Sequence, residues 1–186
     1  MTLQLAIQED ILIERCINKD EHAYAMLYHA HAKQVYYAVN RILTDTAEAE
    51  DIVQESFCIA FEQLGDLKNR ATFGGWVKRI AINRSISFLR KRKLVFVDEA
   101  NAESIEDEDP MEEEVLFANK VEDIKKAISA LPDGYRTIIS LHLFEDMSQD
   151  EIAKELGLSP GTVRSQYHRA KKKIVESLKE RMYYGT

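Results

Sequence analysis

Two stretches of this sequence carry many positive charges and no acid, a composition suited to binding the phosphates of nucleic acid. The first runs from Lys68 to Lys93 and contains nine Lys or Arg residues. The second runs from Arg164 to Lys173, and acids return just beyond it at Glu176 and Glu180. A helix face that meets only solvent normally mixes Glu with its Lys. We therefore expect both stretches to contact nucleic acid rather than water alone.

The whole chain is nevertheless acidic, with a formal net charge of −7. Residues 98–114 hold ten acids and no base, whereas the parts on either side are close to neutral. This stretch has too few large apolar residues to offset the entropy cost of ordering it. We interpret 96–115 as an acidic, flexible linker between two small domains, 1–95 and 116–186. On composition alone, a solvated spacer that has no role beyond connecting the domains is the more common explanation of such a stretch.

We predict an all-α fold of two small helical domains, the C-terminal one a helix-turn-helix. Apolar residues make up 45% of the chain, and it has only seven Gly and three Pro. Its two cysteines, Cys16 and Cys58, lie far apart in helical patterns, so we expect reduced thiols. No run of about 18 apolar residues occurs, and acids occupy the N-terminal stretch where a signal peptide carries bases. We expect a soluble, cytoplasmic protein without membrane insertion.

Residues 148–160 predict two helices joined by a tight turn. Ser148 and Glu151 match a capping box, in which each side chain satisfies a backbone donor at the helix start. Gly157 follows as the expected left-handed terminator. Ser159 then caps a second helix with Pro160 at its first position, where proline's missing N–H costs nothing. This is a helix-turn-helix, whose second helix usually enters the major groove of DNA.

The helical phase of that second helix separates an inner from an outer side. The inner stripe consists of Val163, Tyr167, Ala170 and Ile174. The outer side carries donors for base edges and phosphates, with short side chains near its start that allow close approach. The outer residues are Thr162, Arg164, Ser165, His168, Arg169 and Lys172. We predict that this side contacts duplex DNA.

The stretch "FGGWVKRIAINRSISFLRKRK", from residue 73, predicts another amphipathic helix. Its inner stripe is Val77, Ala81, Phe88 and Leu89, and a second side holds Trp76, Arg79, Asn83, Ser87 and Arg90. A tryptophan alone belongs more often to a core, but an aromatic ring among cations suits unstacked bases of single-stranded DNA. The preceding loop "DLKNRATF" could form a pocket for an extruded base, with Asn83 as its hydrogen-bonding partner.

Upstream, "TDTAEAEDIVQESFCIAFEQL" predicts a helix with an acidic outer side. Val53, Phe57, Ala60, Phe61 and Leu64 should face inward, and Glu48, Asp51, Glu55 and Glu62 outward, with Gln54 at the edge. We expect Ile52 and Ile59 to flank the acids as exposed aliphatic residues. Such a surface suits docking onto a basic protein, although a solvated acidic face remains an open interpretation.

Three motifs in this order resemble the extracytoplasmic-function (ECF) group of bacterial sigma factors. They are "EAEDIVQESF", "FGGWVKRIAINRSISFLRKRK" and "LPDGYRTIISLHLFEDMSQDEIAKELGLSPGTVRSQYHRAKKKI". The likeness covers roughly residues 9–93 and 119–180. It implies a sigma factor whose partners are bacterial core RNA polymerase, promoter DNA (duplex at the −35 element, single-stranded at the −10 element) and an anti-sigma factor. The acidic linker resembles the family segment that threads through the polymerase.

The resemblance also implies roles for individual residues. Core polymerase would bind Asp51, Gln54 and Glu55. The −10 element would contact Lys68, Asn69, Arg70, Phe73, Trp76, Arg79, Asn83 and Arg90. The −35 element would contact Thr162, Arg164, Ser165, His168, Arg169 and Lys172. Gly74 and Gly75 stand where larger residues are common in the family, and we expect them to loosen the helix start.

Two other classes of protein remain open from the residues. A stand-alone helix-turn-helix regulator that dimerises through its N-terminal domain would bind a palindromic operator without polymerase. An enzyme would need a catalytic set, but no Gly-rich phosphate loop and no nucleophile–base pair is recognisable. His29 and His31 lie on a helical pattern without a third ligand, so we expect no catalytic residue, metal or cofactor.

Overall fold

The computed structural model describes residues 3–67, 69, 72–92 and 121–184, with side chains described from residue 9 to residue 180. These residues form α-helices and one 3-10 turn, and no strand occurs among them. The chain divides into two compact units, Met1–Leu89 and Arg90–Thr186. The predicted all-α fold with two helical domains is confirmed.

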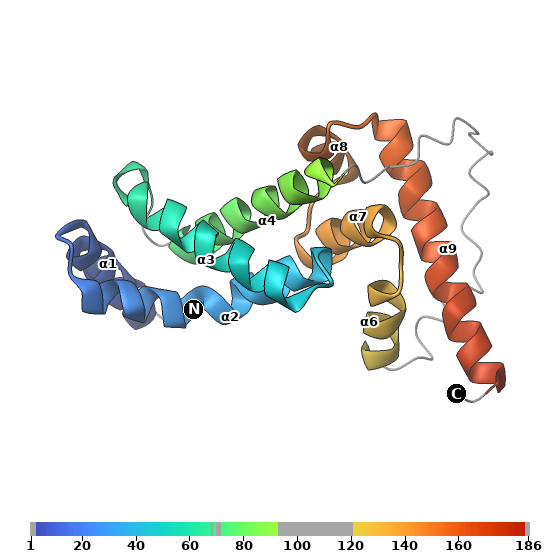
Figure 1. Ribbon diagram of the computed structural model, residues 1–186, viewed down its shortest axis with the longest axis horizontal. Coiled ribbons are helices and arrows are strands. Elements are labelled where there is room, and N and C mark those ends of the chain that lie inside the picture. Colours follow the sequence, from blue (N-terminus) through green and yellow to red (C-terminus); the bar gives the residue numbers. More distant parts are fainter. Residues whose placement is uncertain (1–2, 68, 70–71, 93–120, 185–186) are drawn as a thin grey trace. The chain divides into compact units, whose positions relative to one another are not determined.

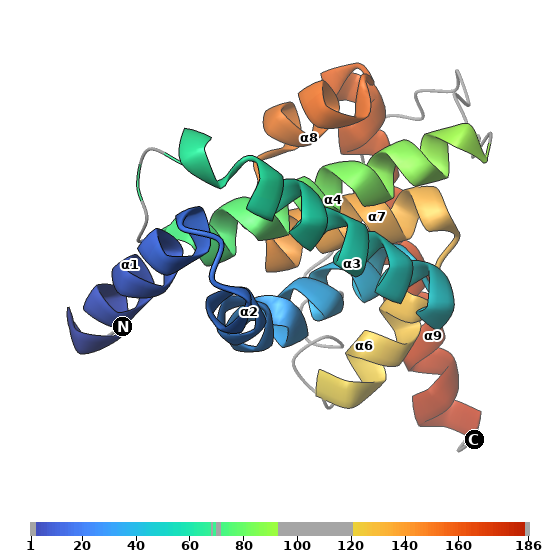
Figure 2. The same ribbon diagram turned by 60° about the vertical axis from the view of Figure 1, so that its left-hand side comes forward.

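In the first unit, the described residues form four helices and a 3-10 turn (Figure 1). These are α1 (Leu3–Ile17), α2 (Glu21–Ile42), α3 (Thr46–Glu62), η1 (Leu64–Asp66) and α4 (Phe73–Lys91). Helix α3 packs along α2, and α1 packs against α2 and η1 (Figure 2). Side chains join α4 to α3, including a stacked pair of rings, Phe61 and Phe73, and an ion pair between Arg84 and Glu55.

Apolar residues at helical spacing explain why these helices pack together. Each helix buries one stripe and leaves the opposite side to solvent. The buried residues include Val35, Ala38, Val39 and Ile42 of α2, Val53, Phe57 and Ala60 of α3, and Val77, Ala81, Ile86 and Leu89 of α4. Ser56 and Ser85 are buried as well, and their hydroxyls donate to carbonyls in their own helices, Ile52 O at 2.6 Å and Ala81 O at 2.9 Å. Those bonds satisfy polar groups that burial would otherwise penalise.

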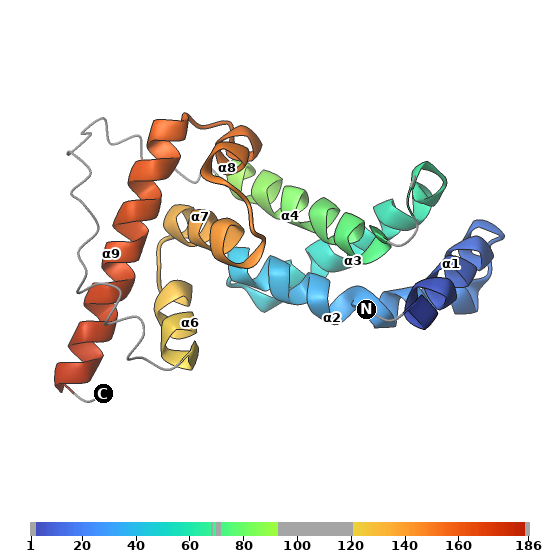
Figure 3. The same ribbon diagram turned by 180° about the vertical axis from the view of Figure 1, so that it is seen from behind.

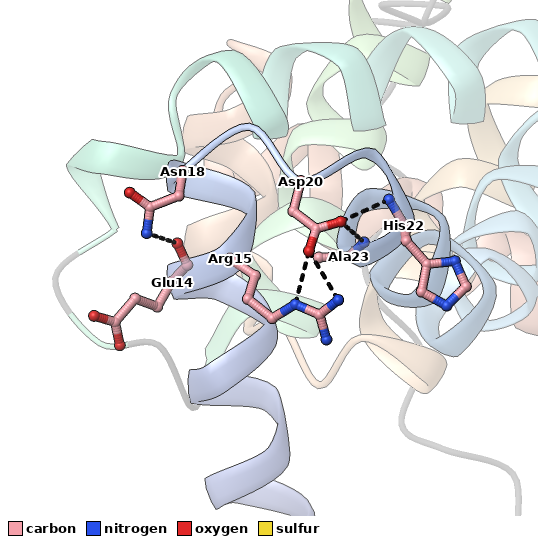
Figure 4. Close-up of polar contacts among 6 residues, drawn as sticks. All are labelled: Glu14, Arg15, Asn18, Asp20, His22 and Ala23. Atoms are coloured by element: carbon pink, nitrogen blue, oxygen red, sulfur yellow. Dashed lines mark hydrogen bonds and ion pairs between the residues drawn. The ribbon is translucent and has the colours of Figure 1, made fainter.

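The corner between α1 and α2 is fixed by one carboxylate (Figure 4). Asp20 is the N-cap of α2, and its Oδ1 accepts hydrogen bonds from the backbone N–H groups of His22 at 3.0 Å and Ala23 at 3.3 Å. Its Oδ2 accepts from Nε of Arg15, in the last turn of α1, at 2.8 Å. The chain can turn here because Lys19 adopts a positive φ of 63°. The Arg15 hydrogen bond lowers the pKa of Asp20, and the two backbone donors lower it further.

The described residues of the second unit form α6 (Val121–Ser129), α7 (Asp133–Phe144), α8 (Gln149–Leu156) and α9 (Pro160–Tyr184). The first three all pack on α9, with α8 nearest to its beginning (Figures 1 and 3). Their shared core contains Ala127, Ile128, Leu131, Ile139, Ala170, Ile174 and Leu178. The apolar contacts therefore fix the rotation of α9 about its own axis.

A buried arginine closes the turn between α6 and α7. Arg136 is only 4% exposed, and its guanidinium donates to the carbonyl of Leu131 at 2.7 Å and pairs with the carboxylate of Asp133. The sequence pattern did not indicate that this arginine is internal. Removing one partner from such a pair would leave a charge buried without compensation.

We predict that protonation of Asp20, at the corner between α1 and α2, makes the first unit less stable as the pH becomes acidic. Folding lowers the pKa of Asp20 below its ordinary value of 3.8. The ionised carboxylate therefore stabilises the folded state fully above that ordinary pKa, and this stabilisation is lost as the pH falls through the lower pKa of the folded chain. Asp20→Ala should lower the unfolding midpoint near pH 7, and the difference from wild type should shrink below about pH 4.

Trp76 is the only tryptophan in the chain and lies in α4, so its fluorescence follows unfolding of the first unit. Asp20→Asn is the matched control, because an amide oxygen can still cap α2 but cannot form an ion pair with Arg15. It should have an intermediate midpoint. Equal midpoints for wild type and Asp20→Ala at pH 7 would contradict this role for the carboxylate.

Candidate functional site

The local signals of the helix-turn-helix are confirmed. The hydroxyl of Ser148 accepts from the backbone N–H of Glu151 at 3.3 Å, and the Glu151 carboxylate accepts from the Ser148 N–H at 2.8 Å. Gly157 has a φ of 67° and ends α8 in the left-handed conformation. The Ser159 hydroxyl accepts from the N–H of Thr162 at 3.0 Å, and α9 begins at Pro160. Together these contacts set where the second helix starts and in which direction it leaves the turn.

Buried residues of α9 lie on the predicted inner side. Val163 and Ala170 are completely buried, Ile174 nearly so, and Tyr167 half-buried with its ring 4.8 Å from that of His142 on α7. Gln166 is also internal, at 4% exposure, and was not among the predicted inner residues. Its spacing of three from Val163 and four from Ala170 would have placed it there.

The opposite side of α9 carries the six residues predicted to contact the −35 element. Arg164 and Lys172 are exposed, and Thr162, Ser165, His168 and Arg169 are half-exposed. The shorter side chains have local partners: the hydroxyls of Thr162 and Ser159 lie 2.8 Å apart, and Ser165 donates to the Thr162 carbonyl at 3.1 Å. The structure therefore brings these residues together on one accessible, basic side of a helix. Guanidinium groups there can donate two parallel bonds to a guanine edge or a phosphate.

Helix α4 has a comparable accessible side. Trp76 is half-buried, and Arg79, Asn83, Ser87 and Arg90 are exposed along the same stripe. Val77, Ala81 and Leu89 are buried as predicted, whereas Phe88 is only half-buried. The stripe thus combines an aromatic ring, an amide and three hydroxyl or guanidinium groups. Trp76, Arg79 and Asn83 are the residues of this stripe that are predicted to contact unpaired DNA, and we call them the single-strand face.

Phe73 lies apart from these exposed residues, because it is fully buried. Its ring is stacked on Phe61 at 6.1 Å between centroids and lies 6.2 Å from the Trp76 ring. Phe73 therefore packs against the inner side of Trp76, and its own ring is not accessible to DNA in this structure.

The loop before α4 is described only in part. Lys68 and Arg70, predicted as −10 contacts, lie outside the described residues. Asn69 is exposed, and its carbonyl accepts from the hydroxyl of Thr72 at 2.6 Å and from the Thr72 N–H at 3.1 Å. These two bonds tie Asn69 to the residue that precedes α4. The acidic linker 96–115 also falls outside the described residues.

The acidic side of α3 matches the prediction in its polar residues but not in its aliphatic ones. Asp51, Gln54 and Glu55 are exposed together, and we call these three residues the acidic face. Ile52 is only 6% exposed, so the expected exposed aliphatic residue at this position is wrong; it belongs to the core. Ile59 is half-buried. The cause is the width of the buried stripe of α3, which extends past the predicted inner residues to include Ala49 and Ser56 as well.

Two neighbours of the acidic face were not predicted. The carboxylate of Glu55 pairs with the guanidinium of Arg84 on α4. Cys58 is an exposed free thiol three residues after Glu55, one helical turn further along the same side. The other cysteine, Cys16, is buried, and burial raises the pKa of its thiol to about 11, with a smaller contribution from the Asp20 carboxylate.

Among the described residues, no group of three His, Cys, Asp or Glu side chains is arranged to hold a metal ion. No described helix is both long and apolar enough to cross a membrane.

Comparison with known proteins identifies both halves of the chain. The family model Sigma-70 region 2 matches residues 27–95, and the model Sigma-70, region 4 matches residues 122–174. RNA polymerase sigma factor SigV of Bacillus subtilis is 33% identical over 142 residues, which are 76% of this chain and 82% of SigV. ECF RNA polymerase sigma factor SigW of the same organism is 29% identical over 171 residues, 87% of this chain and 91% of SigW.

A solved structure shares the fold. The sigma factor RpoE from Bartonella quintana, determined in complex with the anti-sigma factor NepR, aligns with a TM-score of 0.52 at 20% identity. The alignment covers 84% of this chain and 96% of RpoE. The chain belongs to the ECF group of the sigma-70 family of RNA polymerase sigma factors. It is a sigma factor that directs the polymerase to promoters, and a stand-alone regulator is not favoured because residues outside the helix-turn-helix match sigma region 2.

Proposed function

We propose that this chain is a non-catalytic specificity subunit that divides promoter recognition between its two domains. Residues 1–95 would dock on core RNA polymerase and capture the opened −10 strand, residues 116–186 would read the −35 duplex, and residues 96–115 would connect them. The observation that carries this division is the pair of accessible basic faces, one on α4 and one on α9, on separate compact units. The site of action would be the cytoplasm, where the polymerase works.

The single-strand face suits an unpaired DNA strand better than a duplex. A half-buried tryptophan offers a flat surface on which a base can stack, and such stacking is worth about 1–3 kcal/mol per base. Arg79 and Asn83 lie along the same stripe and can donate to the backbone or to the edge of an extruded base. The outer side of α9 suits the duplex, because a recognition helix presents several donors to the major groove at once.

The acidic face of α3 would dock on a basic surface of the polymerase. Asp51 and Glu55 supply negative charge, and Gln54 supplies an amide that can hydrogen-bond at the same contact. An anti-sigma factor would be a further partner, since the complex named for the Bartonella quintana protein contains one. Such a factor would act by keeping the chain from core polymerase.

We predict that charge reversal on the acidic face weakens docking. Asp51→Lys/Glu55→Lys should reduce affinity for bacterial core polymerase by about tenfold or more, because like charges would face each other across the contact. Helicity should stay unchanged, since both side chains are exposed. Glu176→Lys/Glu180→Lys is the matched control, because it makes the same change of net charge on exposed positions of α9. Unaltered affinity of the α3 variant in a binding titration would remove the acidic face from the interface.

The two thiols give an independent footprint of the same contact. Cys58 should be alkylated readily in the free chain, while Cys16 should react slowly because it is buried and its pKa is raised. Adding core polymerase should slow alkylation of Cys58 and leave Cys16 as an internal reference. Equal rates at Cys58 with and without core polymerase would contradict docking through this side of α3.

We predict different defects from the two DNA-contacting faces. Arg169→Ala removes a −35 contact worth about 1–3 kcal/mol, so the holoenzyme should bind duplex promoter poorly but recover on a template already open at −10. Asn83→Ala should instead weaken retention of single-stranded −10 DNA. Lys126→Ala on α6 and Asn18→Ala at the α1–α2 corner, both exposed, serve as controls. Equal loss of single-strand binding from Arg169→Ala and Asn83→Ala would refute the division of labour.

A further inference from the structure

Two adjacent glycines at the start of α4 have different surroundings. A Cβ atom at Gly74 would lie 2.5 Å from Nδ1 and 2.7 Å from Cε1 of His31, which is closer than real Cβ atoms approach other atoms. A Cβ atom at Gly75 would have no neighbour within 4 Å. Beyond the expected loosening of the helix start, the absent side chain at Gly74 lets an imidazole ring pack against the helix backbone.

The His31 ring cannot easily move away, because it is held from other sides. Its Nε2 atom lies 2.9 Å from Oε1 of Glu9 on α1, and the two side chains are only 18% and 12% exposed. Its ring also packs edge-on against Phe73, with centroids 5.5 Å apart. His31 on α2 thus touches both α1 and the first turn of α4.

These contacts lead directly to the single-strand face. Phe73, between His31 and Trp76, is fully buried and contacts both rings. The position of the first turn of α4 therefore depends on how closely the His31 ring approaches Gly74. Because Trp76 lies in that turn, a shift of the turn would move its ring as well.

We propose that His31 is a positioning residue for the single-strand face: its ring, held by Glu9, sets the first turn of α4 through Gly74 and Phe73, and so places Trp76 for base stacking. This inference rests on the proposed role of Trp76 in binding single-stranded DNA. It assigns to His31 no direct contact with DNA.

If His31 sets this turn, the effect of Gly74→Ala on single-strand binding depends on the residue at position 31. Alanine favours a helix more than glycine does, so Gly74→Ala should help α4 wherever there is room for it. With His31 present there is no room, and the added methyl group must displace the ring from Glu9 or the turn from its place. With His31→Ala the space is open. Gly75→Ala is the matched control, since it adds the same group one residue later without a clash.

The experiment compares wild type, Gly74→Ala, Gly75→Ala, His31→Ala and His31→Ala/Gly74→Ala. The emission of Trp76, the only tryptophan, is recorded on the free chain. Holoenzyme reconstituted with bacterial core polymerase is then tested for retention of a random-sequence single-stranded DNA pool. Gly74→Ala should shift the emission and lower retention by about fivefold to a hundredfold, the range for losing one stacked base. Gly75→Ala should behave as wild type.

In the His31→Ala background, Gly74→Ala should raise retention instead of lowering it, as a double-mutant cycle measures. Wild-type retention by Gly74→Ala, or failure of His31→Ala to reverse its effect, would overturn the proposal. Should His31→Ala lower the helicity seen by circular dichroism, the comparison of Gly74→Ala with Gly75→Ala in the presence of His31 still tests the proposal. Failure of the proposed function looks different: Trp76→Ala holoenzyme would then retain as much single-stranded DNA as wild type.

Discussion

Burial of one apolar stripe on α4 and one on α9 is the constraint on which the functional surfaces depend. A helix that buries Val163, Ala170 and Ile174 has no freedom to rotate, so Arg164 and Lys172 must face outward. Burial of Val77, Ala81 and Leu89 does the same for the stripe that begins at Trp76. The hydrophobic effect itself has no direction, yet burial of these stripes determines which hydrogen-bond donors face solvent.

The charged side chains lie on the surface of these packed helices and contribute little to the packing itself. The acidic face of α3 and the basic side of α4 belong to neighbouring helices, and Glu55 and Arg84 pair between them. Exposed ion pairs of this kind add little stability, so the effect of this pair is to hold the Glu55 and Arg84 side chains in place. A chain of net charge −7 can thus bind DNA, because the acids and bases that matter occupy different helices and different sides.

Local signals in the sequence predicted local structure well. The capping box at Ser148 and Glu151 and the terminator Gly157 depend on neighbours a few residues away, so their pattern was sufficient to define the helix-turn-helix. Helical spacing likewise separated the two sides of α9. The errors arose where a distant helix decides the environment. Ile52 is buried because α3 packs into the domain over a wide stripe, and the pattern of a single helix does not give that width.

The same limit applies to the polar interior. His31 meets Gly74 across 43 positions of sequence, and nothing near either residue indicates the contact. Glu55 and Arg84 also come from different helices. Arg136 is a different case, since its partners Leu131 and Asp133 are close in sequence, but arginine is so often exposed that its burial was not expected. Of the predicted −10 residues that the structure describes, Phe73 alone is buried, because its ring packs between those of Phe61 and Trp76.

Transcription in vitro from a promoter library, with purified bacterial core polymerase and with or without this chain, tests the central claim most directly. The account predicts transcripts from defined start sites that appear only when core polymerase and the chain are both present. The promoters selected should share two short elements, one for each DNA-contacting face. Binding of the chain to a palindromic site without core polymerase, together with no new start sites, would contradict it.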